Sequence, residues 1–205
     1  MSRDYDWIGG RSELAPEIVS SMHAFRHEIF VRRLGWSLPL VEGVERDQYD
    51  NEDAVYFIAR DPTDSVTACA RLLPTIKKCL LSELAEDLLG HNPPPCDPLV
   101  WELSRFATNV RKSGEGRVLS LSQPTLDLLA AIIEFARRHE IRQLVLATSV
   151  AIERLLIRAG FDVHRLAAPR RMPDGLFVVI FIEVAVTSAA PEMEDVAYSP
   201  GYYTA

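Results

Sequence analysis

Apolar residues recur at helical spacing in the first part of the chain, between residues 16 and 35. Pro16 suits the first turn of a helix, where its missing N–H is not needed, and Gly35 suits the end, because glycine tolerates the conformation that closes a helix. The pattern therefore predicts one amphipathic helix over this range. Its apolar face would consist of Ile18, Met22, Phe25 and Ile29.

Short apolar runs bounded by turn residues predict a sheet after this helix. Residues 54–60 (AVYFIAR) and 65–73 (SVTACARLL) flank the turn sequence DPTDS, and this arrangement predicts a hairpin. Further strands are predicted over residues 99–107, 142–148 and 176–186. The last run, LFVVIFIEVAV, is apolar enough to indicate a strand that is buried on both faces.

Helical periodicity returns between these later strands. Ser122 is a good N-cap for a helix that runs to about His139, and a second helix over residues 150–159 would end at Gly160. Residues 80–89 fit either a short helix or a loop.

The order of these elements is a helix, antiparallel strands, and then strand, helix, strand, helix and strand. It predicts the α/β class, as a single-domain α-β-α sandwich with a mixed, mostly antiparallel sheet. We expect one domain over residues 1–187. The C-terminal tail, residues 188–205, is poor in large aliphatic side chains, and we expect it to be loosely ordered.

Composition restricts the class of protein. The 205 residues are 48% hydrophobic and 25% charged, with no apolar run near the ~18 residues of a membrane helix. The acidic N-terminus does not resemble a secretory signal. Cys69, Cys79 and Cys96 lack metal-ligand spacing and fit free thiols, so we expect a cytoplasmic protein without a metal site or membrane span.

The charge of the chain argues against general nucleic-acid binding. The net charge is −7, but residues 1–100 carry 10 Lys/Arg against 17 Asp/Glu, whereas residues 105–171 carry 12 against 6. The second region would offer a basic face to an acidic partner, or its helix surfaces are simply rich in arginine. The candidate residues for this face are Arg137, Arg138, Arg142, Arg154 and Arg158.

Several charged residues lie inside apolar segments. Arg26 lies in HAFRHEIF, Arg71 in TACARLLP, and Glu102 and Arg105 in WELSRFA. Burial of an unpaired charge is prohibitive, so these residues need partners. On a regular strand Glu102 and Arg105 point to opposite faces, and only a bulge or splay would bring both to one cavity.

The acidic run ERDQYDNED, residues 45–53, supplies such partners. We expect Asp47 and Asp50 to face inward with support from Glu45, while Glu52 and Asp53 form a solvated rim. A cavity with arginines and carboxylates together would hold a zwitterion, and the alternative is a set of ordinary ion pairs at sheet edges. The expected lining is Arg26, Arg71, Asp47, Asp50 and Glu102.

The chain resembles the acyl-homoserine-lactone synthases, the LuxI-type autoinducer synthases. The likeness spans about residues 20–165 and includes the segments CARLLPT, residues 69–75, and WELSRFA, residues 101–107. The N-terminal signature of this family corresponds here to Arg26, Phe30, Trp36, Asp47 and Asp50. The resemblance implies a fold like that of the GCN5-type N-acetyltransferases.

The resemblance also implies a reaction with two substrates. An acyl thioester, on acyl carrier protein or coenzyme A, would acylate the amine of S-adenosylmethionine, and lactonisation would release methylthioadenosine and a quorum-sensing signal. S-adenosylmethionine is then a substrate, and no cofactor is expected; we expect a monomer. Glu102 is the candidate general base, and Arg105 would orient it or bind substrate.

The remaining site residues divide between the two substrates. Phe30 and Trp36 suit the sulfonium and adenine, or pack in the core, and peptide N–H groups near Phe106 would stabilise an oxyanion. Thr148 would hydrogen-bond a substituent on the third acyl carbon, or it caps the next helix. The expected acyl-chain pocket is Leu103, Ser104, Leu146, Thr148 and Ser149.

An acetyl-coenzyme A-dependent N-acetyltransferase of a small amine is the alternative function. The segment RKSGEG, residues 111–116, fits the phosphate loop R-x-x-G-x-G of that superfamily weakly, because the best helix start lies several residues later, at Ser122. A sensor that binds S-adenosylmethionine without turnover is a further alternative. The acyl group and its carrier are not specified by the sequence.

Overall fold

In the computed structural model, residues 7–109, 120–173 and 175–184 are described. The tail over residues 188–205 and the RKSGEG segment lie outside these ranges. Four α-helices and one π-helical segment occur within them. The bounds are α1 Pro16–Arg26, η1 His27–Arg33, α2 Leu80–Leu89, α3 Gln123–Arg138 and α4 Val150–Arg158.

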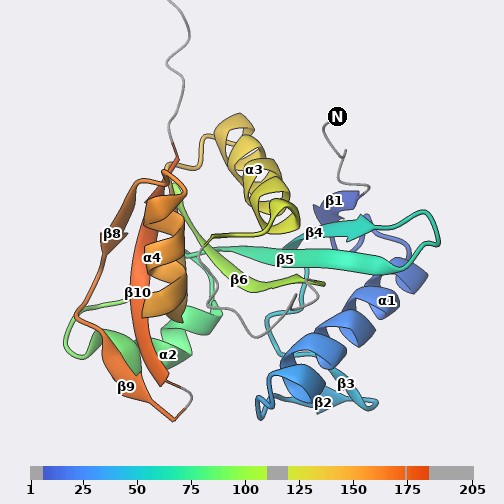
Figure 1. The fold of residues 1–205 in the computed structure, drawn as a ribbon, viewed down its shortest axis with the longest axis horizontal. Helices are drawn as coiled ribbons and strands as arrows, with labels where there is room; N and C mark the ends of the chain where they lie inside the picture. Colours follow the sequence, from blue (N-terminus) through green and yellow to red (C-terminus); the bar gives the residue numbers. More distant parts are fainter. Residues whose placement is uncertain (1–6, 110–119, 174, 185–205) are drawn as a thin grey trace, which may run out of the picture.

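The strands form one large sheet and one small hairpin (Figure 1). In the large sheet the order is β1-β4-β5-β6-β7-β10-β8, and β9 pairs with β10. All pairs are antiparallel except β6 with β7, so the sheet is mixed and mostly antiparallel, as predicted. The bounds are β1 Trp7–Gly10, β2 Leu40–Val41, β3 Val44–Glu45, β4 Val55–Arg60, β5 Val66–Pro74, β6 Val100–Thr108, β7 Gln143–Ser149, β8 Val163–Arg165, β9 Arg170–Met172 and β10 Gly175–Glu183.

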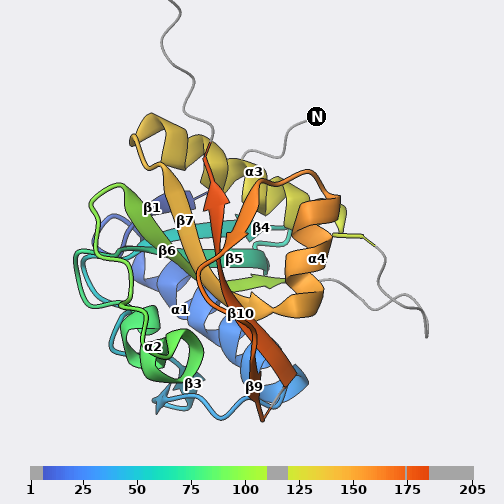
Figure 2. The ribbon, with the colours of Figure 1, turned by 90° about the vertical axis from the view of Figure 1, so that its left-hand side faces the viewer.

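Helices cover both faces of this sheet. Met22 of α1 and Leu81 of α2 belong to one apolar core, and Leu128 of α3 and Leu156 of α4 belong to the other. Figures 1 and 2 show α3 and α1 on opposite sides of the strands. Alternate residues of β7 and β10 serve the two cores, which explains why the apolar run of β10 is nearly continuous. The structure confirms the predicted α-β-α sandwich.

Helix starts follow the sequence signals. The Ser122 hydroxyl accepts a hydrogen bond from the N–H of Thr125 at 3.4 Å, and Ser149 caps α4 in the same way through Ile152. Thr148 is therefore not the cap of α4. No helix in the described ranges is long and apolar enough to span a membrane. The three cysteines are free thiols, as expected.

Candidate active site in the cleft between β6 and β7

The central feature of the sheet is the divergence of its one parallel pair. Strands β6 and β7 pair only over Val100–Glu102, although β6 continues to Thr108 and β7 to Ser149. Beyond Glu102 the two strands separate, and both line a cleft of about 2470 Å³. Cavities that hold one small ligand enclose roughly 300–1,000 Å³, so this cleft has room for two substrates.

A bulge in β6 rotates Arg105 toward this cleft. Arg71 pairs with Ser104 and Cys69 with Ala107, so two steps along β5 match three along β6. Arg105 takes up the extra residue with a φ of 51°, a conformation that non-glycine residues adopt rarely. Consequently Glu102 and Arg105 both line the cleft, although they would point apart on a regular strand.

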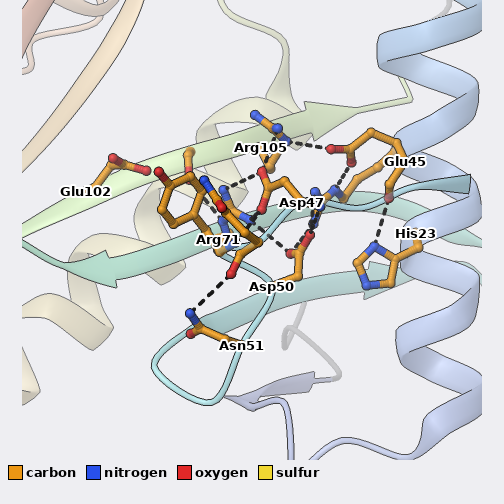
Figure 3. A network of polar contacts seen from close by, with 12 residues as sticks. His23, Glu45, Asp47, Asp50, Asn51, Arg71, Glu102 and Arg105 are labelled. Carbon is orange, nitrogen blue, oxygen red and sulfur yellow. Dashed lines mark hydrogen bonds and ion pairs between the residues drawn. The ribbon is translucent and has the colours of Figure 1, made fainter. Parts of the chain in front are cut away.

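A closed ring of alternating charges lies beside the bulge (Figure 3). Each of three arginines pairs with two carboxylates, and each carboxylate with two arginines, at 2.5 to 3.0 Å. The ring is therefore formally neutral, which offsets the cost of removing six charges from water. It runs through Arg26, Glu45, Arg105, Asp47, Arg71 and Asp50, and returns to Arg26.

The ring fixes the ionisation of its members. Burial acts to raise the pKa of Asp50, but the charges of Arg26 and Arg71 outweigh it, and the pKa falls well below its usual range. The hydroxyl of Tyr56 donates a further hydrogen bond to Asp50 at 3.0 Å. Burial, followed by the Asp50 charge, raises the pKa of Tyr56 above its ordinary value, so the hydroxyl stays a donor.

Only part of the ring reaches the cleft. Asp47 and Arg105 line it, and their side chains are 6% and 7% exposed. Arg26, Asp50 and Arg71 lie behind them, at most 3% exposed, and do not line the cleft. The ion pairs hold these three side chains behind the cleft wall, where they support Asp47 and Arg105, and the substrate contacts expected for them stay a prediction.

Glu102 lies at the point where the strands separate. Its Oε2 accepts a hydrogen bond of 2.6 Å from the N–H of Leu81, in the first turn of α2. Its Oε1 is buried and has no hydrogen-bond partner among the described residues. Arg105 pairs with Glu45 and Asp47, so the ring, and not Glu102, determines its orientation. One oxygen of Glu102 is thus anchored, and the other is left without a hydrogen bond among the described residues.

Phe30 and Trp36 form a stacked aromatic pair on another wall. Their ring centroids are 5.2 Å apart with an interplanar angle of 9°, and both residues line the cleft. Phe30 belongs to the π segment η1, where the sequence predicted a continuous α-helix to Gly35. The wider turn displaces the side chains after Arg26 from α-helical spacing, so η1 presents Phe30 toward Trp36.

The residues expected for the acyl chain line both arms of the divergence, together with Phe106. Thr148 is half-buried in β7, opposite Val178 of β10. The expected acyl-chain residues are Leu103, Ser104, Leu146, Thr148 and Ser149, and all five line the cleft.

The five arginines of the expected basic face are all exposed, and Arg138 pairs with Glu134 of α3.

Sequence reasoning missed several polar residues of this cleft, and three of them lie next to one another. Gln48, Tyr49 and Glu83 line it, and the Gln48 amide donates a hydrogen bond to Glu83. The acidic run contains Gln48 and Tyr49, but the sequence prediction rests on its carboxylates alone as partners of the arginines. Glu83 carries no local signal, because an acidic residue in the first turn of a short helix is ordinary. Within the described ranges, no cluster of three or more His, Cys, Asp or Glu residues is arranged to hold a metal ion.

Comparison with known proteins identifies close relatives of the chain. A profile of the autoinducer synthase family matches residues 11–190. An acyl-homoserine-lactone synthase of Ralstonia solanacearum is 38% identical over 203 residues, which cover 95% of this chain and 97% of the relative.

Solved structures agree. TofI, in a ternary complex with an inhibitor and MTA, has 36% identity and a TM-score of 0.72, covering 87% of this chain and 90% of its own. BjaI, a CoA-dependent acyl-homoserine lactone synthase with SAM and isopentyl-CoA, has 29% identity and a TM-score of 0.75. The match covers 86% of this chain and 82% of BjaI. A predicted N-acetyltransferase of Lactobacillus plantarum shares the fold alone, with 18% identity and a TM-score of 0.57. The match covers 87% of this chain and 97% of that protein.

Proposed function

Since the chain belongs to the autoinducer synthase family, we propose that the cleft between β6 and β7 is the active site of an acyl-homoserine-lactone synthase. The enzyme joins the acyl group of a thioester to the amine of S-adenosylmethionine and closes the product to a lactone. It releases an N-acyl-homoserine lactone, a quorum-sensing signal, and methylthioadenosine.

The main support for this position of the active site is that β6 and β7 diverge at Glu102. The strands open there into two arms that share one carboxylate, and the ring edge with Asp47 and Arg105 lies on one side. A reaction between two substrates requires two binding arms that meet at one reactive group. The arrangement holds the amine and the thioester next to each other, which removes the entropic cost of their encounter.

Glu102 acts as the general base in the acylation step. Its unpartnered Oε1 takes a proton from the ammonium of S-adenosylmethionine, directly or through one water. The amine nitrogen then bonds to the thioester carbon, the carbon–sulfur bond breaks, and the thiolate takes up a proton. Peptide N–H groups near Phe106, where β6 no longer pairs with β7, stabilise the oxyanion.

Lactonisation follows within the same arm. The carboxylate oxygen of the acylated product attacks the γ-carbon, and the sulfonium leaves as the neutral thioether methylthioadenosine. Arg105 holds the carboxylate, and the stacked pair of Phe30 and Trp36 binds the adenosyl group by stacking and cation–π attraction. No metal takes part in this scheme.

The second arm takes the acyl donor. The walls from Leu103 and Leu146 are apolar and buried, and suit the chain. The donor is an acyl thioester on acyl carrier protein or on coenzyme A; BjaI is coenzyme A-dependent. We assign docking of an acidic carrier protein to the basic face of α3, α4 and the start of β7, where the five arginines are exposed.

Product analysis tests the function. Extracts of a heterologous host that expresses the chain should contain a defined N-acyl-homoserine lactone by mass spectrometry, which also gives the acyl length. Purified protein should release methylthioadenosine only when S-adenosylmethionine and an acyl thioester are both present. Acetylated amines without any need for S-adenosylmethionine would instead support the N-acetyltransferase alternative, which family membership disfavours.

Glu102→Gln tests the assigned base. The amide keeps an oxygen for the Leu81 N–H but cannot accept the proton, so kcat should fall about 10²- to 10⁴-fold while the Kd of S-adenosylmethionine changes little. Methylthioadenosine release and calorimetric titration measure the two quantities. Full activity in this variant would remove Glu102 from the role of base.

A further inference from the structure

Glu83 differs from the other carboxylates of the cleft in its partners. Of the residues that the structure describes, three acidic ones line the cleft: Asp47, Glu83 and Glu102. Asp47 is bound to two arginines, and Glu102 is anchored on a peptide N–H. Glu83 instead accepts a hydrogen bond from a neutral group, the Gln48 amide, and interacts with the neutral Tyr49 hydroxyl, so neither of them neutralises its negative charge.

Tyr49 connects Glu83 to the charged ring. Tyr49 is 4% exposed and lines the cleft, and its ring lies under the Arg71 guanidinium, whose Cζ is 5.8 Å from the ring centroid. Burial, followed by the hydrogen bond to Glu83, raises the pKa of the Tyr49 hydroxyl to about 12. Since the hydroxyl keeps its proton at neutral pH, it can donate to the Glu83 carboxylate, which is exposed on the wall formed by α2.

The formal charges along the cleft leave an excess of one negative charge. Within the described ranges, two basic residues, Arg46 and Arg105, line it against three carboxylates. S-adenosylmethionine carries a sulfonium, an ammonium and a carboxylate, and its net charge is +1. The ammonium faces Glu102 in the proposed function, and the carboxylate faces Arg105. The sulfonium meets the faces of Phe30 and Trp36 by cation–π attraction, but no carboxylate has yet been matched to it.

We propose that Glu83, oriented by Tyr49 and Gln48, is a specificity-determining residue that recognises the positive charge of the sulfonium. The inference rests on the proposed function and names how its acceptor substrate is distinguished from neutral thioethers. The charge that Glu83 recognises also disappears during the reaction. Lactonisation converts the sulfonium into a neutral thioether, so methylthioadenosine loses this attraction as soon as it forms and leaves more readily than S-adenosylmethionine.

Paired ligands test the inference. S-adenosylhomocysteine has the same amino acid, ribose and adenine groups but lacks the sulfonium charge. We expect Glu83→Gln to weaken S-adenosylmethionine binding about two- to fivefold, the range for an exposed charge pair, and to leave the Kd of S-adenosylhomocysteine unchanged. Tyr49→Phe should give a smaller loss with the same preference. Isothermal titration calorimetry measures both ligands on each variant.

Glu86→Gln is the matched control, because Glu86 is an exposed acidic residue of the same helix and does not line the cleft. It should change neither Kd. Equal weakening of both ligands by Glu83→Gln would overturn the inference, since Glu83 would then contact a group that they share, such as the ribose. Unchanged binding of S-adenosylmethionine would overturn it as well.

The two proposals fail in different ways. If the wild-type protein releases no methylthioadenosine with any acyl thioester, the proposed function fails. If the wild type makes lactone but Glu83→Gln keeps the wild-type ratio of the two dissociation constants, the sulfonium inference alone fails. Thermal melting of each variant confirms that the comparison is made between folded proteins.

Discussion

Arg26 and Arg71 are among the largest side chains in the structure that are almost fully enclosed, and neither touches the cleft. Their guanidinium groups hold Glu45, Asp47 and Asp50 at fixed positions. Their function at the residue scale is therefore geometric. A neutral ring places Asp47 and Arg105 at the cleft wall without leaving any buried charge unpaired.

The ring should respond strongly to the loss of one member. Arg26→Ala leaves Glu45 and Asp50 buried with one arginine each, so we expect the free energy of unfolding to fall by about 3–5 kcal/mol. Urea denaturation measures it. Arg33→Ala is the control, because Arg33 pairs with Glu28 at the surface, where such a pair contributes about 0–1 kcal/mol. Equal effects of the two variants would contradict the view of the ring as a buried framework.

His23 introduces a pH dependence next to this ring. Burial, followed by the charge of Arg26, lowers its pKa below 6.5. The unfolded chain then binds the proton more readily than the folded one, so the contribution of His23 to stability is complete above about pH 6.5 and is lost as pH falls through the folded pKa. We expect urea midpoints of the wild type to decrease from pH 7 to 5.

The matched variant is His23→Asn, which has no ionisable side chain. Its urea midpoint should depend less on pH over the same interval, whatever its absolute stability. The other four histidines stay in place, so an unchanged slope would show that the pH dependence arises outside His23.

At the scale of elements, the apolar period was sufficient to predict a helix or strand wherever one face of that element is buried along its length. Helices α3 and α4 and the hairpin β4–β5 follow the predicted ranges within two residues, because each carries a clear apolar face with turn or cap residues at its ends. The short strands β1, β2, β3, β8 and β9 were not predicted. Runs of two to four residues lack a period, and their pairing depends on neighbours that are distant in sequence.

Two local irregularities create the site, and neither can be read from the sequence pattern. The π segment η1 replaces the last turns of the first helix, and the bulge at Arg105 interrupts β6. Both conformations are unfavourable locally and are maintained by tertiary contacts, including the ion pairs of Arg105. The sequence therefore identified the charged residues but not which of them lie behind the cleft wall.

The junction of β7 and α4 carries two neighbouring hydroxyls, Ser149, which caps α4, and Thr148, which lines the cleft and which we expect to contact the acyl substituent. Thr148→Val should lower the use of acyl donors with an oxo or hydroxy group on the third carbon relative to unsubstituted donors, because it removes the hydroxyl that would bond this group. Ser149→Ala, which removes the cap of α4, should instead lower the free energy of unfolding by about 1 kcal/mol.

Competition between the two donor types, followed by mass spectrometry of the lactones, measures the first effect. Thermal or urea denaturation measures the second. An unchanged product ratio in Thr148→Val would contradict the role of Thr148 in reading the acyl substituent.

On the scale of the whole molecule, charge is divided between regions. The chain is acidic overall at −7, yet residues 105–171 carry 12 basic against 6 acidic residues. The exposed Arg142 and Arg154 belong to this half, at the start of β7 and on α4. Since β7 is also one arm of the cleft, a carrier protein bound to this face would be able to deliver its acyl group into that arm.

Charge reversal distinguishes a carrier-protein donor from coenzyme A. Arg142→Glu together with Arg154→Glu should raise the KM for acyl carrier protein about tenfold, from a loss of roughly 1–2 kcal/mol of attraction, and should weaken its dependence on salt. The KM for the matching acyl-coenzyme A should stay nearly constant, because that donor does not need a protein-docking face. Arg32→Glu is the control, since Arg32 is 71% exposed and lies on η1, outside the basic half. Steady-state rates with both donors at two ionic strengths measure these quantities. A KM for carrier protein that responds equally to the control, or not at all, would place the docking surface elsewhere.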